Sequence, residues 1–362
     1  MSAFRALLLS FVYCSPVVAA EFFTSGRIIG RGNTSVAQYA GAQGGRFNPA
    51  TLAETNSTFQ LRPLEFNGIV GENVVSTISD IQSHDFSSND SNKVISFVRK
   101  FGDKFGERHY GRFELIPLAT QIFRFEAMPF VINQSYIEIN RPTIPEFDFD
   151  VDTLAGINLA YGYDFNGKFK VGGAVRPTYH HELEGALTFT DLIDLENLES
   201  EEISKAASGF GIGVDAGVLW TPTATLRLGA VVQNIGGMGY LSSDGSPSVL
   251  LQSTSIGGAY AYKMSRWDFN FLADVKHLEN PDGEHWIQLL NLGAEFGRQL
   301  FTRDLDIGLT AGLYDGNTSY GLFVDLWLAR VELAKYTEEI GRQPGVKRDK
   351  RLTMTISSSM TL

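Results

Sequence analysis

Between residues 208 and 328 apolar side chains recur at every second position, and this alternation constrains the fold more than any other feature of the chain. In 209–220 one face carries only Phe, Ile, Val, Ala and Trp, and the other is mostly glycine. The same split recurs over 267–276, 290–297 and 320–326. A period of two is that of a β-strand with two different faces. The sequence therefore predicts an all-β fold.

The joins between the predicted strands favour a closed barrel over a soluble sandwich. Fourteen segments can be assigned to strands: 57–70, 109–125, 128–140, 154–165, 168–183, 209–221, 224–234, 248–263, 266–277, 286–297, 304–314, 318–327, 330–338 and 351–361. Short joins, such as 126–128 and Asn166-Gly167, alternate with long ones, such as 141–153. Outer-membrane barrels keep short turns on the periplasmic side and long loops outside. We predict a transmembrane antiparallel β-barrel of about 14 strands over 57–362, with the short join 315–317 as the weakest point of the count.

The first twenty residues have the three parts of a secretory signal peptide. Arg5 supplies the positive charge, the apolar run 6–13 is too short to span a bilayer, and small residues at 18–20 predict cleavage before Glu21. A lipoprotein with Cys14 acylated is the competing interpretation, which the bulky residues before Cys14 disfavour. We expect a bacterial outer-membrane protein, surrounded by outer-membrane lipid, whose mature chain contains no cysteine.

The charge balance argues against nucleic acid as a partner. The chain has 30 basic and 41 acidic side chains, so removal of Arg5 with the signal leaves 29 against 41, a formal charge of −12. Gly211-x-Gly213 matches a dinucleotide fingerprint by letter but lies inside a strand, which favours small lumen-facing residues over a cofactor. No cofactor is predicted.

Acidic and histidine clusters are interpreted without a metal or a catalytic role. The acidic run 146–152 fails the calcium-loop pattern and predicts a solvated external loop. His180 and His181 are adjacent on a strand, so they face opposite sides and cannot chelate one metal ion together. A phospholipase would need a Ser–His pair on the lipid face, and the serines of 357–359 are many strands away from His180. We predict no enzyme, no catalytic residue and no metal site.

The segment 21–56 precedes the strands and lacks sustained alternation. Asn48 can cap a short helix whose first residue is Pro49, where a proline's fixed φ is well suited. The stretch 47–53, Phe-Asn-Pro-Ala-Thr-Leu-Ala, resembles the FadL-like family of outer-membrane transporters for fatty acids and other hydrophobic compounds. That resemblance implies a hatch inside the barrel lumen, with hatch residues Phe47, Asn48, Pro49, Ala50 and Leu52. The plasmid-transfer TraF-type proteins, a related branch without an established transport substrate, resemble the same stretch.

Two further groups of residues are candidates for function. We expect helical external loops near 72–108 and 185–208, the first with an apolar stripe for a ligand or protein partner: Val94, Val98, Phe101 and Phe105. Packing of this stripe against the chain's own loops is the simpler interpretation. Eight charged side chains are predicted to face the lumen: Arg176, Asp215, Arg227, Asp268, Asp274, Glu295, Asp325 and Arg330. They form either a cross-braced interior or a selective constriction.

Two functions remain open from the sequence. The first is passive, hatch-gated uptake of a small hydrophobic compound through the barrel. The second is a non-transporting outer-membrane scaffold or assembly and secretion partner, as the TraF-type resemblance implies. The identity of a transported compound does not follow from the sequence.

Overall fold

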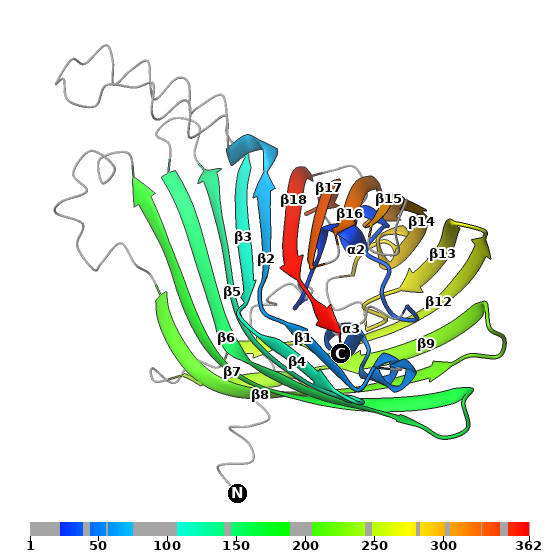
Figure 1. The fold of residues 1–362 in the computed structure, drawn as a ribbon. Coiled ribbons are helices and arrows are strands. Elements are labelled where there is room, and N and C mark those ends of the chain that lie inside the picture. The colour runs from blue at the N-terminus through cyan, green and yellow to red at the C-terminus, as the bar shows by residue number, and fades with distance from the viewer. Residues whose placement is uncertain are drawn as a thin grey trace, which may run out of the picture.

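A computed structural model describes residues 22–38, 44–55, 57–74, 107–140, 146–188, 205–242, 248–279, 283–300, 305–326, 328–340 and 347–361 (Figure 1). Its short helices are α2 (Gly26–Gly30), α3 (Gly44–Phe47), the 3-10 helix η1 (Pro49–Glu54) and α7 (Trp286–Leu289). None of the helices within these ranges is long and apolar enough to cross a membrane. The predicted signal peptide lies outside the described residues.

The β-structure comprises nineteen elements. They are β1 (Phe59–Arg62), β2 (Glu65–Gly71), β3 (Arg108–Ile116), β4 (Ala119–Ile122), β5 (Phe125–Asn140), β6 (Glu146–Asp164), β7 (Phe169–Thr188), β8 (Lys205–Trp220), β9 (Leu226–Gln233), β10 (Met238–Ser242), β11 (Ser248–Leu250), β12 (Ser253–Met264), β13 (Trp267–Val275), β14 (Leu290–Leu300), β15 (Leu305–Tyr314), β16 (Asn317–Leu326), β17 (Ala329–Glu339), β18 (Arg348–Ser358) and β19 (Met360–Thr361).

These elements form a closed antiparallel barrel of fourteen wall strands, which confirms the predicted fold class. Five wall strands are interrupted once, so β1/β2, β3/β4, β9/β10, β11/β12 and β18/β19 each count as one. Pro63 and Pro117 lie at the first two breaks, where a residue without an N–H cannot continue the ladder. The last wall strand pairs with the first, β18 with β2 and β19 with β1, and this closes the ring.

Several element boundaries differ from the predicted ones. The turn predicted at 126–128 lies at 123–124, where Phe123 has a positive φ of 52°. The short join 315–317 is a tight turn with positive φ at both Asp315 and Gly316, the geometry that a two-residue hairpin needs. It therefore does not remove a strand from the count.

The strands β5 to β8 are longer than the sequence predicted. β6 has 19 residues and β7 has 20, whereas about 9–11 residues cross a bilayer. The acidic run 146–152, predicted as a loop, is therefore part of β6, and 185–188 and 205–208 are strand rather than loop. The reason is pairing: each extension is hydrogen-bonded to a neighbouring strand that extends equally far. The stripe Val94, Val98, Phe101 and Phe105 of the first predicted loop lies outside the described residues.

The two faces of the wall differ as the alternation requires. Large apolar side chains stand exposed on the outer face, for example Phe66, Val214, Phe271 and Leu322. Polar and charged side chains are buried on the inner face, for example Asn67 on β2. Lipid tails accept the outer face, and the inner polar groups must find partners inside the barrel.

The turn between β15 and β16 contains a carboxyl group with a shifted pKa. Burial raises the pKa of Asp315 to about 8 from its ordinary 3.8, although the hydrogen bond that its carboxylate accepts from the Glu339 backbone N–H lowers it. The folded chain therefore holds this proton where the unfolded chain has lost it. This group's stabilising contribution is complete below pH 3.8 and is lost as the pH rises to about 8.

We expect Asp315→Asn to flatten the pH dependence of the barrel's unfolding midpoint in denaturant between about pH 5 and pH 8. Glu279→Gln is the control, because the pKa of Glu279 is lowered through hydrogen bonds from Thr254 that outweigh its burial. The stabilising contribution of Glu279 is lost only at acidic pH. An unchanged slope for Asp315→Asn contradicts the prediction.

Candidate functional site: the contact between the N-terminal segment and the barrel wall

Residues 22–38 and 44–55, hereafter the N-terminal segment, lie inside the ring of strands (Figure 1). The helix α2 begins after Ser25, whose side chain accepts a hydrogen bond from the Ile28 backbone N–H at 3.3 Å. The α2 helix packs against β16 and β17, and α3 and η1 pack against β6 to β8. The segment therefore bridges opposite sides of the barrel.

Asn48 joins the two halves of the segment to the wall. Its Oδ1 accepts the Ala50 backbone N–H at 3.1 Å, which caps η1, and Pro49 occupies the first helical position as expected. Its Nδ2 donates to the carbonyl of Val36 at 2.8 Å and approaches that of Val218 on β8 at 3.3 Å. The side chain is fully buried. The structure thus places Asn48, Pro49 and Ala50 against the wall inside the lumen.

A row of wall glycines makes room for this turn. Gly162, Gly172 and Gly217 are register partners on β6, β7 and β8. A Cβ added at Gly172 would lie 2.3 Å from the Pro49 carbonyl carbon, and one at Gly217 would lie 2.0 Å from Asn48 Oδ1. Any larger residue in this row would overlap the backbone or the cap of the turn. The row, hereafter the glycine floor, therefore determines how deeply the segment seats.

On the opposite wall, Glu295 of β14 binds two arginines of the segment. Arg27 donates to both carboxylate oxygens at 2.7 Å, and Arg31 Nη1 donates at 3.1 Å. Asn270 of β13 adds a hydrogen bond at 3.0 Å. Burial alone would lower the pKa of Arg27, but Glu295 raises it above its ordinary value. For Arg31 burial outweighs Glu295 and its pKa is lowered, so Arg27 is the better compensated partner.

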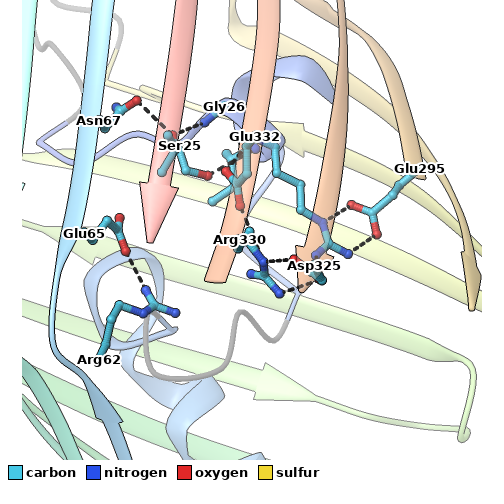
Figure 2. Close-up of polar contacts among 12 residues, drawn as sticks. Ser25, Gly26, Arg62, Glu65, Asn67, Glu295, Asp325, Arg330 and Glu332 are labelled. Carbon is cyan, nitrogen blue, oxygen red and sulfur yellow. Dashed lines mark hydrogen bonds and ion pairs between the residues drawn. The ribbon is translucent and has the colours of Figure 1, made fainter. Parts of the chain in front are cut away.

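Neighbouring polar groups extend this contact along α2. The Arg27 backbone N–H donates to Glu332 at 2.9 Å, and the Gly26 N–H donates to Thr355 Oγ1 at 2.8 Å. Arg330 and Asp325, register partners on β17 and β16, form an ion pair beside them (Figure 2). Backbone donors in the first turn of α2, which have no partner within the helix, are thus satisfied by the wall.

A second carboxylate holds the other half of the segment. Glu65 of β2 accepts from Arg46 Nη1 at 2.8 Å and from Arg62 Nη1 at 2.6 Å (Figure 2 shows the latter pair). Arg46 and Glu65 are both fully buried. Because an isolated charge inside protein is costly, each member of this triad depends on the others.

Aromatic side chains of the segment fill the lumen beside β5. Phe22 and Phe23 meet Phe130 edge-on, each with 5.2 Å between ring centroids. Phe130 is flanked by Met128 and Ile132 on the inner face of β5, and Phe47 belongs to the same cluster. The inner face of β5 is therefore apolar, which the alternation rule did not predict. The cluster Phe22, Phe23, Phe47, Met128, Phe130 and Ile132 is named the apolar lumen patch.

Three more predicted lumen residues contact the segment or one another beside it. Arg176 is fully buried, binds Asp215 through two bonds of 3.0 and 3.2 Å, and stacks over the Phe22 ring at 4.1 Å. Asp274 accepts the backbone N–H groups of Ser35 and Val36 at 2.6 and 3.0 Å. Inside the barrel, Asp215 therefore binds a cation and Asp274 accepts hydrogen bonds from backbone donors.

The remaining predicted residues lie nearer the barrel mouths. Arg227 forms an ion pair with Glu54 at 3.2 Å, and Asp268 pairs with the exposed Lys263 at 3.4 Å. Leu52 is fully buried in a cluster with Ala160 and Ala174. Sequence reasoning missed Arg27, Arg31 and Arg46 of the segment. Their signal was available: three basic residues lie in a stretch without strand alternation, and five of the eight charged residues predicted to face the lumen are acidic.

At the outer rim the two histidines face opposite sides as expected. His180 contacts Asp152 at 2.9 Å inside the barrel, and His181 Nδ1 contacts Ser208 Oγ at 2.7 Å on the outer face. This Ser–His contact was not foreseen, since Ser208 was assigned to the end of a loop. No carboxylate partner of His181 occurs among the residues that the structure describes. No cluster of three metal-binding side chains occurs within the described ranges.

Solved structures with a similar fold are outer-membrane channels and transporters. The Ralstonia pickettii toluene transporter TbuX matches with a TM-score of 0.54 at 10% identity, covering 95% of this chain and 100% of that chain. The CymD monoaromatic hydrocarbon channel gives 0.53 at 12%, covering 95% and 98%. The Pseudomonas putida toluene transporter TodX gives 0.53 at 13%, covering 94% and 98%. At these identities the likeness shows the fold.

The closed fourteen-strand ring and these likenesses define the class by its fold: an antiparallel β-barrel like those of the hydrocarbon channel and the toluene transporters. The family model described as "F plasmid transfer operon, TraF, protein" matches residues 2–238, well over half of the chain. The chain therefore belongs to this TraF family. No curated protein matches the sequence.

Proposed function

We propose that this protein mediates passive uptake of small hydrophobic compounds across the outer membrane, with the N-terminal segment acting as its hatch. The observation that carries the proposal is the apolar lumen patch. Half of its residues belong to the N-terminal segment and half belong to β5. The cavity beside it, lined by Phe22, Phe23 and Phe47 together with β9 and β12, measures only about 20 Å³. That volume holds a water molecule, so a hydrophobic molecule enters only when the segment moves.

The contacts that hold the N-terminal segment against the wall support its role as a movable hatch. It is held largely through buried ion pairs and hydrogen bonds to Glu65, Asp274 and Glu295, which water can replace when the segment leaves the wall. The named neighbours TbuX and TodX are described as toluene transporters, and this suggests monoaromatic compounds as the first cargo to test. Export by a signal peptide cleaved before Glu21 completes the proposal and is tested by the mass of the mature protein.

We expect liposomes containing the mature protein to take up radiolabelled toluene faster than empty liposomes. Phe130→Ala should weaken binding about a hundredfold, because removal of a fully buried aromatic side chain costs about 3 kcal/mol and each 1.4 kcal/mol is a factor of about ten. Phe271→Ala, on the exposed outer face, is the matched control. Uptake equal to empty liposomes across a panel of hydrophobic compounds, together with no bound ligand by mass spectrometry, overturns the proposal.

The family assignment favours a second candidate, a non-transporting scaffold that serves a protein partner in the outer membrane. Its discriminator is co-purification from the native membrane after mild detergent extraction. A stoichiometric partner, retained without any uptake activity in the liposome assay, favours the scaffold. A lone barrel that transports favours the first candidate.

A further inference from the structure

A cavity of about 330 Å³ opens where the N-terminal segment ends. It is lined by Glu54, the last residue of η1, by the turns that join β6 to β7 and β8 to β9, and by Lys170 of β7 and Arg227 of β9. These are short turns, so the cavity lies at the end of the barrel that faces the periplasm in the predicted topology. Its volume is that of a small-molecule site.

The charges around this cavity do not balance. Glu54 forms ion pairs with Lys170 Nζ at 3.3 Å and with Arg227 Nε at 3.2 Å. Lys168 is exposed at the cavity and has no acidic partner among the described residues. Three cations thus surround one carboxylate, which leaves a formal charge of +2 in a chain whose overall charge is −11.

Two of the three cations, Lys170 and Arg227, are held in place by contacts within the protein. Lys170 is buried and also donates to Thr221 Oγ1 at 3.0 Å and to the Gly167 carbonyl at 3.3 Å. The Gly167 turn is itself fastened by Asp164, which accepts the Gly167 backbone N–H at 2.6 Å. A preorganised pair of cations in a concave site favours an anion over bulk water.

We propose that this cavity binds a small dianion with carboxylate or phosphate groups, which enters from the periplasmic side and competes with Glu54 for Lys170 and Arg227. Glu54 already shows that the site accepts a carboxylate, and the surplus of two positive charges suits a dianion. Because Glu54 ends the N-terminal segment, a bound anion would release that end from β7 and β9. This consequence rests on the proposed hatch, whereas the binding site itself does not.

Calorimetry on the purified mature protein tests the site with two probes, succinate and inorganic phosphate, against sodium chloride of equal ionic strength. We expect saturable binding of at least one probe, and the two arms distinguish carboxylate from phosphate chemistry. Arg227→Ala and Lys168→Ala should each weaken binding about tenfold, the loss typical of one charged hydrogen bond. Lys263→Ala is the matched control, since Lys263 is an exposed lysine near another short turn and pairs with Asp268.

The Glu54→Gln variant tests whether Glu54 competes with the bound anion. It keeps the size of the side chain and removes the competing charge, so it should tighten anion binding about tenfold. A site formed by lysines alone, without competition, would not respond in this way. The proposal is overturned if neither probe binds the wild-type protein or Glu54→Gln, or if Glu54→Gln binds no more tightly than the wild type.

Coupling to the segment needs a separate readout. Thr51→Cys places one thiol on the buried face of η1, in a mature chain predicted to contain no other cysteine. Succinate or phosphate should raise its maleimide labelling rate in the wild-type background and not in Arg227→Ala. Anion binding without faster labelling refutes release of the segment, and it leaves the uptake assay to decide the proposed function by itself.

Discussion

Replacing Glu295 with alanine is expected to destabilise the protein by about 3–5 kcal/mol, because the change leaves the buried Arg31 without an acid and the half-buried Arg27 with only Asp325, at 3.7 Å. Arg27 and Arg31 are both held by this one carboxylate, and Arg31 has no other ion pair among the described residues. The lost stability comes from the packing of α2 against the wall. The strand hydrogen bonds are not affected, since the β14 backbone pairs with β13 and β15 independently of this side chain. The variant should therefore keep its barrel and lose its seated segment.

Two measurements separate these effects. The denaturant midpoint of the purified protein gives the loss of stability, and a cysteine at Thr34, which is fully buried, reports seating of the segment through its labelling rate. Asp268→Ala removes a carboxylate from the neighbouring strand, where it pairs with an exposed lysine and contributes at most about 1 kcal/mol. Equal midpoints and equal labelling for Glu295→Ala and Asp268→Ala would refute the assignment of Glu295 as the main anchor of α2.

The barrel could be predicted from the sequence because its wall obeys a local rule. Each strand between lipid and lumen must alternate, so residues such as Phe210 and Gly211 reveal their faces without knowledge of the partner strand. Join lengths then gave the strand count, including the Asp315-Gly316 turn. The ends of β6 and β7 could not be predicted in this way, because beyond the bilayer a strand continues only as far as its neighbour does.

The contact between the N-terminal segment and the wall depends on pairs far apart in sequence. Arg27 and Glu295 are 268 residues apart, and no local pattern relates them. Asn48 and Pro49 were recognisable because capping and proline geometry are local. The apolar inner face of β5 was missed since its outer face is apolar as well, so that period two is hidden over 127–132. A strand that loses its alternation inside a barrel indicates a lumen filled by protein.

The second substitution with a large expected effect lies in the glycine floor. Gly172→Val is expected to unseat the N-terminal segment, because its Cβ would lie 2.3 Å from the Pro49 carbonyl carbon and 2.4 Å from the Ala50 nitrogen. Both are backbone atoms that cannot rotate away, and β7 is fixed by its ladders to β6 and β8. The segment must move. A fourteen-strand ring without the N-terminal segment inside it is wide enough for a water channel. We therefore expect the variant to conduct ions continuously in planar bilayers, at the level of an open pore.

The adjacent glycine supplies the control. Gly173 faces the outer side of β7, and a Cβ there would lie 3.6 Å from its nearest neighbour, the Asp215 carbonyl oxygen, an ordinary contact. Gly173→Val should therefore keep the wild-type conductance, whereas Gly217→Ala, whose Cβ would meet Asn48 Oδ1, should open the pore as Gly172→Val does. If Gly172→Val folds as a barrel and conducts like Gly173→Val, the segment does not close the lumen. The glycines would then serve only the packing of a fixed plug, and the scaffold would become the better account of this protein.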